Sequence, residues 1–188
     1  MTRRLFAATL VLGSLSLAPH AWGQASTPAQ SGVAPMPMKP PVPASKSLTV
    51  TFEGHTTVFT VAELMKMKQV TLKVKNEHRG GIEESYTGPL LSDVLASSGL
   101  TASRETQPLI LHSSIIATGT DHYFVLYSAA EVEPMFSTGQ VIVAIMKGDS
   151  LPDTEGGTIQ LVNTVDARPA RWLHGLANIN VMSLSPTK

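Results

Sequence analysis

The chain of 188 residues contains no cysteine. Disulfide bonds are therefore excluded, and so are the zinc sites that depend on cysteine ligands. A folded domain of this sequence must take its stability from a packed core, for which the hydrophobic content of 43% is sufficient. The length suits one domain of ordinary size once the terminal segments are set apart.

Charge is also scarce in this chain. Charged residues make up 15% of the sequence, and the formal net charge is zero. Without a basic excess, no field attracts nucleic acid or an anionic membrane surface, so we exclude these two classes of partner. The only long apolar run lies at the N-terminus, and we expect no membrane span in the mature chain.

The N-terminus has the pattern of a cleaved signal peptide. A pair of arginines precedes an apolar run over residues 5–17, and the small residues Ala21 and Gly23 mark a cleavage site. We expect the signal peptide to span residues 1–23, with a cleavage up to two residues later as the alternative. The paired arginines fit either the twin-arginine or the general secretory route. The protein is therefore expected to be periplasmic or secreted.

Residues 24–47 are expected to form a proline-rich linker. Six prolines lie among alanine, serine and methionine here, and this composition favours an extended chain. Met36 and Met38 offer thioether sulfurs to Cu(I), but two methionines without a nearby histidine favour a plain spacer. The folded domain is expected over residues 48–184, followed by a tail over residues 185–188.

Hydrophobic periodicity predicts a strand-rich α+β domain with two or three short helices. Ser/Thr-x-x-Glu capping boxes at Thr60 and Ser128 predict the starts of two helices, and a third is expected to begin at Pro89 and stop at Gly99. The expected strands, from their alternating apolar residues, cover 48–52, 56–59, 70–74, 109–111, 115–117, 123–127, 141–146, 159–162 and 177–181. A two-residue turn is expected at Gly54-His55, and a polar loop over 76–84. The order of elements lacks the regular alternation of a βαβ fold.

The segment 158–181 concentrates the residues best suited to chemistry. Between two expected strands lie one acid, two arginines, a tryptophan and a histidine, namely Asp166, Arg168, Arg171, Trp172 and His174. Guanidinium groups together with an indole and an imidazole suit an anionic or planar aromatic ligand. The alternative is an ion-paired loop whose arginines cover the edge of the core and whose tryptophan is buried. On this segment alone, the ion-paired loop is the favoured interpretation.

Several short motifs occur in an order that resembles one known family, the sulfite oxidase-like molybdopterin-binding domains. The motifs are a strand over 70–74, Tyr86-Thr87-Gly88, Leu90-Leu91, Asp121-His122-Tyr123, Ser128-Ala129-Ala130-Glu131, Gly148-Asp149 and Arg171-Trp172 before the last strand. The resemblance extends over about residues 48–182 and implies that family's α+β fold, with a strand-rich mixed sheet. Gly157-Thr158 departs from the Gly-Pro that the family often has at this point.

The same resemblance implies a molybdopterin cofactor, and here the sequence departs from the family. The family's enzymes hold molybdenum through the pterin dithiolene and one cysteine thiolate, from the loop after an early strand. That position falls near Asn76 in this chain. A neutral asparagine amide cannot replace an anionic thiolate ligand. The resemblance therefore implies the scaffold and its pocket without the oxidation chemistry.

We expect a binding pocket bounded by residues 76–81, 112–123 and 168–174. Its arginines would engage phosphate or carboxylate, and Trp172 or Tyr123 would stack on the ligand. Glycines in the loop 76–81 let the backbone approach a ligand, and an ordinary solvated connection is the equally weighted alternative. The candidate binding residues are Asn76, His78, Arg79, His112, Asp121, Tyr123, Arg168, Arg171, Trp172 and His174.

Other catalytic and metal sites find little support in the sequence. The histidines outside the signal peptide form no close pair of the kind that holds a metal ion, so no metal site is expected. A site assembled from His78, His112 and His122 across loops is the less favoured interpretation. No G-x-S-x-G motif accompanies Asp121, which argues against a hydrolase triad.

Three functions remain as hypotheses. The first is an exported, non-catalytic module that binds a small anionic or pterin-like ligand or a periplasmic partner protein. The second is a molybdopterin-dependent oxidoreductase, or a subunit of one, that lacks the cysteine ligand. The third is a periplasmic copper- or zinc-binding protein that uses histidines and methionines. Because the chain has no cysteine, the first hypothesis is favoured over the second.

Overall fold

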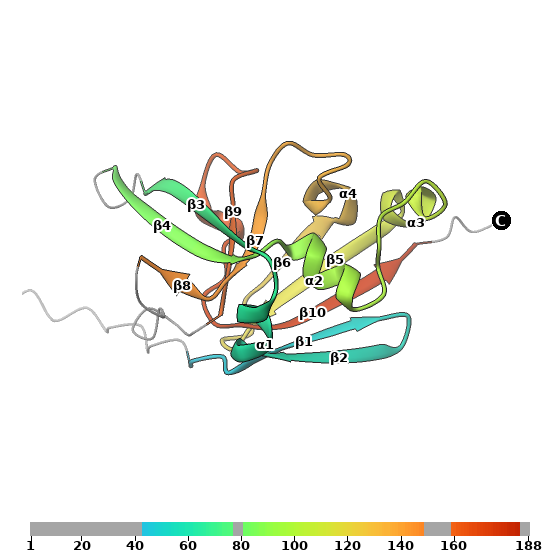
Figure 1. Cartoon of the computed structure of the whole chain (residues 1–188), viewed down its shortest axis with the longest axis horizontal. Helices are drawn as coiled ribbons and strands as arrows, with labels where there is room; N and C mark the ends of the chain where they lie inside the picture. The colour runs from blue at the N-terminus through green and yellow to red at the C-terminus, as the bar shows by residue number, and fades with distance from the viewer. Residues whose placement is uncertain (1–42, 77–80, 149–158, 185–188) are drawn as a thin grey trace, which may run out of the picture. The chain divides into compact units, whose positions relative to one another are not determined.

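The computed structural model describes residues 43–76, 81–148 and 159–184. The expected signal peptide, most of the linker, the tail, and both His78 and Arg79 lie outside the described residues. Within the described part, strands dominate and the helices are short (Figure 1). None of the described helices is long and apolar enough to cross a membrane.

The largest sheet has five strands in the order β2-β1-β10-β5-β6. These strands are β1 (Ser47–Phe52), β2 (His55–Thr60), β5 (Ser113–Gly119), β6 (Phe124–Ser128) and β10 (Leu176–Ser183). β1 and β10, the first and last strands, lie side by side and run parallel, whereas the other neighbours are antiparallel (Figure 1). Alternate residues of β1 and β5 are buried, so one face of this mixed sheet packs on the core.

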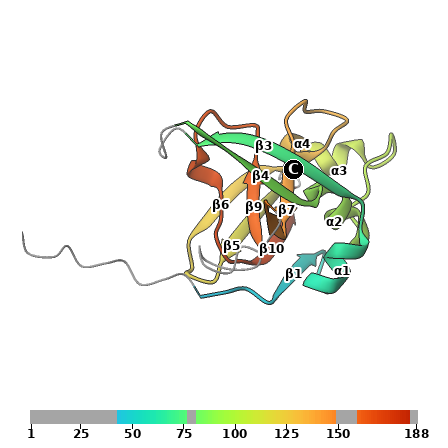
Figure 2. The same ribbon diagram turned by 60° about the vertical axis from the view of Figure 1, so that its left-hand side comes forward.

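Two smaller sheets stand beside the large one. The first contains β3 (Gln69–Asn76), β4 (Ile82–Pro89) and β8 (Met146–Lys147), and the second pairs β7 (Val141–Ala144) with β9 (Gln160–Asn163). The β3–β4 hairpin lies over the β7–β9 pair (Figure 2). Every residue of β7 and β9 is buried, as expected for strands covered on both faces.

The β7–β9 pair separates two hydrophobic clusters. Val143 and Leu161 belong to the main core, which also holds the inner face of the five-stranded sheet. Ile142 and Val162 belong to a second cluster, formed with the β3–β4 hairpin and bordered by Trp172. The alternation of strand side chains thus sends successive residues of one strand into different cores.

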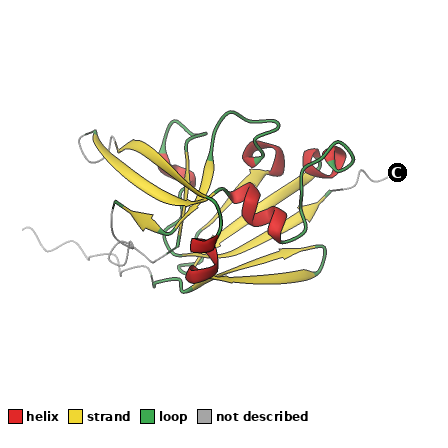
Figure 3. Ribbon diagram, in the orientation of Figure 1, coloured by secondary structure: helices red, strands yellow, loops and turns green. Residues whose placement is uncertain are grey.

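The four described α-helices pack on the core side of the large sheet, whereas the 3₁₀ helix lies beside β9 (Figure 3). They are α1 (Val61–Lys66), α2 (Leu91–Ser97), α3 (Gln107–Leu111), α4 (Ala129–Val132) and the 3₁₀ helix η2 (Pro169–Arg171). Both predicted capping boxes, at Thr60 and Ser128, are confirmed. The predicted stop of α2 at Gly99 is also confirmed, since Gly99 has a φ of +105° and the Leu100 N–H bonds to the Leu95 carbonyl.

Several local predictions were wrong in instructive ways. Residues 109–111 form the end of α3 rather than a strand, because three apolar residues carry no period and Pro108 suits a helical first turn. The first hairpin turns at Glu53-Gly54, which both have positive φ, so His55 already pairs with Phe52. The described helices number four plus η2, more than the two or three expected.

Two further boundaries also differ from expectation. Ile82 to Glu84 belong to β4 and pair with the end of β3, so the polar loop is shorter than predicted. Pro89 ends β4 instead of opening α2, and Leu90 is the residue before the helix. The strand predicted over 141–146 is interrupted at Ile145, whose N–H bonds to the Thr87 carbonyl.

Gly88 stands where β4 crosses β7, and this crossing permits no side chain. A Cβ built on Gly88 would lie 2.0 Å from the Val143 carbonyl oxygen. We expect Gly88→Ala to lower the free energy of unfolding by about 3 kcal/mol or more, because two backbones must separate. Urea unfolding measures this change. Gly54→Asn, in a turn where nothing lies within 4 Å of the added Cβ, should cost only about 1 kcal/mol, from the positive φ of that position; equal losses would contradict this account.

Candidate functional site

Arg171 uses all five of its side-chain N–H groups inside the protein. Nε donates to Asp166 Oδ2 at 2.8 Å and Nη2 donates to Asp166 Oδ1, which makes a forked ion pair. Nη1 donates to the Leu126 carbonyl oxygen at 3.0 Å, and both Nη atoms donate to Glu131 Oε1. The guanidinium group also lies over the Tyr127 ring, 4.3 Å from its centroid.

Buried polar groups extend the hydrogen-bond network of Arg171 toward the core. Tyr127 donates its hydroxyl hydrogen to the Arg171 carbonyl at 2.8 Å, and Asn163 Nδ2 donates to the Tyr127 hydroxyl oxygen at 2.7 Å. The Asp166 N–H donates to Asn163 Oδ1 at 3.1 Å. Burial raises the pKa of Tyr127 to about 12, which keeps its hydroxyl protonated. We call Tyr127, Glu131, Asn163, Asp166 and Arg171 the arginine cluster.

For Arg171, the arginine cluster distinguishes the two interpretations of segment 158–181, a ligand-binding loop and an ion-paired loop. Arg171 is half-buried and saturated, so it does not offer hydrogen bonds to a ligand. The interpretation as an ion-paired loop is therefore correct for Arg171. The Arg171 hydrogen bonds also hold the pKa of Asp166 below its ordinary value, so that carboxylate stays ionised and paired.

Trp172 follows η2 and closes the rim of the second hydrophobic cluster. Its Nε1 donates to the Asn163 carbonyl oxygen at 3.1 Å. Its ring meets Tyr86 edge to face, with centroids 5.5 Å apart and planes at 78°. These two contacts fix the indole, and its remaining surface faces a hollow.

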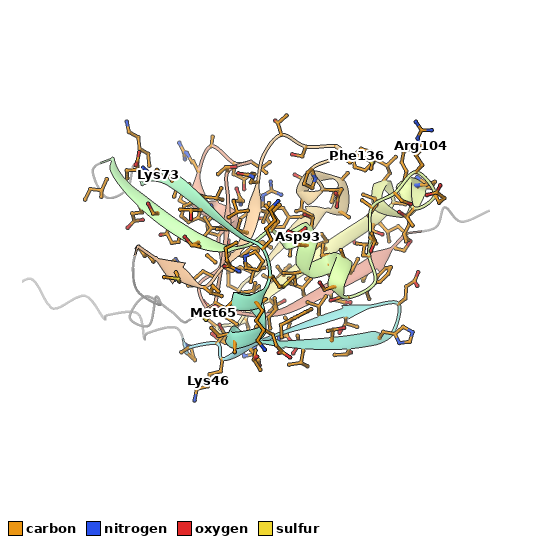
Figure 4. All side chains as sticks on the ribbon, viewed as in Figure 1. Lys46, Met65, Lys73, Asp93, Arg104 and Phe136 are labelled. Atoms are coloured by element: carbon orange, nitrogen blue, oxygen red, sulfur yellow. The ribbon has the colours of Figure 1, made fainter. Side chains whose placement is uncertain are left out.

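A hollow of about 250 Å³ lies between β3 and the segment 163–172. It is lined by two lysines, one arginine, one acid and a largely apolar wall: Lys73, Val74, Lys75, Asn163, Thr164, Asp166, Ala167, Arg168, Pro169 and Trp172. We call it the cationic hollow. Lys73 is labelled in Figure 4, and its Nζ lies 3.6 Å from Glu83 Oε1. Both side chains are exposed, so this ion pair adds little to the stability of the fold. The lining holds three cations, Lys73, Lys75 and Arg168, and one acid, Asp166, so it is net positive.

Six of the predicted site residues line three different hollows rather than one pocket. Arg168 and Trp172 line the cationic hollow, and the backbone of Asn76 follows Lys75 at its β3 border. Trp172 also lines a second hollow of about 260 Å³, with the three candidates Asp121, Tyr123 and His174. His112 lines a third, of about 500 Å³.

The described candidates thus do not share the single pocket expected from residues 76–81, 112–123 and 168–174, and residues 77–80 of that prediction lie outside the described residues. His112 precedes β5 and Asp121 follows it, so a whole strand of about 20 Å separates them. Tyr123 donates its hydroxyl hydrogen to the Ala170 carbonyl at 3.0 Å, which holds it against η2. His78 and Arg79 lie outside the described residues.

Sequence reasoning missed Lys73 and Lys75 as lining residues. Their signal was present, because residues two apart in a strand share one face and β3 was predicted correctly. It also missed Glu131 as a partner of Arg171, because Glu131 was assigned to the capping box alone. One carboxylate oxygen of Glu131 caps Ser128 and the other bonds to Arg171.

The residues present do not fit a molybdenum ion held by a thiolate. The chain has no cysteine, and the cationic hollow offers ammonium, guanidinium and indole groups. In the described part of the chain, no group of three or more His, Asp or Glu side chains is placed to hold a metal ion. The volume of the cationic hollow is slightly below that of pockets for drug-sized ligands, about 300–1,000 Å³.

Comparisons with known proteins bear on the fold. No protein-family model and no curated protein matches the sequence. Among solved structures, the fold is similar to that of the sulfane dehydrogenase SoxCD from Paracoccus pantotrophus, with a TM-score of 0.56 and 16% sequence identity. The likeness covers 78% of this chain and 41% of that chain. At this identity it shows the fold alone, a strand-rich α+β arrangement.

Arg171→Lys tests whether the arginine cluster depends on the guanidinium fork. A lysine keeps the charge but cannot reach the Asp166 carboxylate, Glu131 and the Leu126 carbonyl together. We expect the free energy of unfolding to fall by about 2–3 kcal/mol, as hydrogen bonds to charged groups are lost. Chemical denaturation measures it, with Arg168→Lys on the exposed surface as the matched control. Equal effects in both variants would contradict the structural role.

Asp166 should contribute acid sensitivity to folding. Because its folded pKa is depressed, its stabilising contribution is complete above the ordinary aspartate pKa and is lost as pH falls through the folded pKa, below about pH 4. We expect the wild-type unfolding free energy to drop more than that of Asp166→Asn over this range. Denaturation midpoints measured at neutral and acid pH check this, and parallel pH profiles would refute it.

Proposed function

We propose that this protein is an exported, non-catalytic binding module built on a sulfite oxidase-like molybdopterin-binding scaffold. Its proposed ligand is a small anion, such as a phosphate or carboxylate, attached to a planar group. The observation that carries the proposal is the net positive lining of the cationic hollow, where Arg168, Lys73 and Lys75 border an exposed edge of Trp172. The motif resemblance and the fold likeness support the scaffold.

The charge balance of the hollow selects an anion. Asp166 gives both carboxylate oxygens to Arg171, and Glu83 pairs with Lys73, so the positive charge of the lining rests mainly on Lys75 and Arg168. Arg168 is exposed on the loop before η2, with five N–H donors in a fixed fork that suits phosphate and carboxylate oxygens. The lysines add charge without imposing a geometry. Phosphate or carboxylate binding is therefore the chemistry best matched to these donors.

The aromatic wall of the cationic hollow, formed by Trp172, favours a ligand with a planar group. Trp172 is held by Asn163 and Tyr86, so its ring is already fixed before any ligand arrives. A rigid aromatic surface binds a flat ring with little loss of side-chain freedom. Pro169 lies on the same lining and adds a second rigid apolar surface. A fragment-sized ligand fits this small volume better than a complete large cofactor.

A molybdopterin oxidoreductase, or a subunit of one, is the second candidate. The fold likeness to a protein named a sulfane dehydrogenase favours it. The absence of a cysteine argues against it, because molybdenum would lack the thiolate that the resembled family supplies. Measuring the molybdenum and pterin content of the protein purified from its native compartment distinguishes the two proposed functions. Stoichiometric molybdenum and pterin would overturn the non-catalytic proposal.

Binding of guanosine monophosphate and of inorganic phosphate tests the hollow directly. In the full chain carrying Trp22→Phe, Trp172 is the single tryptophan, so its fluorescence reports on the site. We expect saturable quenching by the nucleotide, stronger binding of the nucleotide than of phosphate, and weaker binding of both at high salt. Arg168→Ala should weaken both by about tenfold, the equivalent of one charge-assisted hydrogen bond.

Arg104→Ala is the matched control, since Arg104 is exposed before α3 and far from Lys73 in Figure 4. It should leave both affinities unchanged. Failure of both probes to bind, or an equal loss in the two arginine variants, would contradict an anion site in the cationic hollow. Calorimetric titration provides an independent measure of the same affinities.

A further inference from the structure

The five-stranded sheet has a second face, which points away from the core. Ile116, Phe124 and Leu126 lie on it, and the last two are 59% and 54% exposed. The register pairs Ile116 with Leu126 and Thr118 with Phe124, so these side chains are neighbours. We call this the outer face.

The outer face is free of formal charge. In the described strands β2, β1, β10, β5 and β6, its positions hold threonine, serine, asparagine and apolar residues, without any Asp, Glu, Lys or Arg. The exposed side of β3, by contrast, carries lysines. Depletion of charge distinguishes the centre of an interface from ordinary surface.

An apolar hollow adjoins one end of this face. Leu111, Leu126 and Leu184 line it, next to Ser114, and its volume is about 500 Å³. Leu184 is held there because its N–H donates to the His112 carbonyl at 2.8 Å. The space is ample for one bulky apolar side chain, although His112 and Glu131 also line it. Phe124 is the largest apolar side chain exposed on the outer face.

We propose that the outer face pairs with the outer face of a second copy of this chain, with Phe124 of each copy entering the apolar hollow of the other. In a two-fold dimer the same patch meets itself, and a charged patch would repel its copy. The uncharged outer face avoids that repulsion. Its hydroxyl and amide groups both donate and accept hydrogen bonds, so they can pair with their own kind.

The size of the sheet sets the expected strength. Five strands about 4.8 Å apart and about 17 Å long present about 400 Å² per copy in projection. Two such faces, with their side-chain relief, reach about the 1,000 Å² total at which specific interfaces begin. Interfaces of about 1,600 Å² already range from micromolar to picomolar affinity, and this one is smaller, so we expect a reversible dimer with a dissociation constant of about 1–100 μM.

Sedimentation equilibrium of the full chain tests the pairing. We expect the average mass to rise with concentration from monomer to dimer and no further. Phe124→Glu should weaken association at least tenfold, because it places a charge in an apolar hollow. Met65→Glu is the matched control, since Met65 is a 52% exposed apolar residue on α1 (Figure 4), on the core side of the sheet.

Leu184→Glu serves as a second variant if Phe124→Glu does not fold, because Leu184 lies beyond β10 and is 60% exposed. A wild-type chain that stays monomeric throughout the predicted range would overturn the proposal. So would equal weakening by Met65→Glu, or species larger than a dimer. A purified chain that stays monomeric and instead binds a different protein of its compartment would also overturn it.

Discussion

Arg171 and Asp166 form a forked ion pair, and the two hollows that share Trp172 depend on it for the position of their common wall. One guanidinium group joins the loop after β9 to the backbone of β6 and the start of α4, which lie 45 and 40 positions before Arg171 in the sequence. It thereby fixes η2 and Trp172, which form the shared wall of the two hollows. A residue whose type suggests ligand binding instead positions the residues that line these hollows.

The fold supports this arrangement through a strand pair that serves two cores. Because β7 and β9 are buried on both faces, the hairpin above them and the sheet beside them share one rigid partition. The close approach at Gly88 draws β4 onto β7. Lys73 and Lys75, on β3, are thereby carried to the border of the cationic hollow.

Local signals in the sequence predicted the elements better than their assembly. Capping boxes at Thr60 and Ser128 were reliable because their hydrogen bonds form within four residues. The partner of Arg171 was not predictable in this way, since Glu131 lies forty positions earlier and is brought near only by the sheet. The three-way division of the expected pocket has the same cause: strand length and register, which no short motif contains, decide which loops meet.

β6 is the outermost strand of its sheet, and a bare strand edge is a template for uncontrolled polymerisation. Here the Leu126 carbonyl is occupied by Arg171, and the Ser128 N–H is occupied by Glu131. The arginine cluster therefore also blocks backbone pairing at this strand edge, where neighbouring exposed apolar side chains would favour aggregation. Selection on this arginine would then protect the solubility of the folded protein in its compartment as well as its shape.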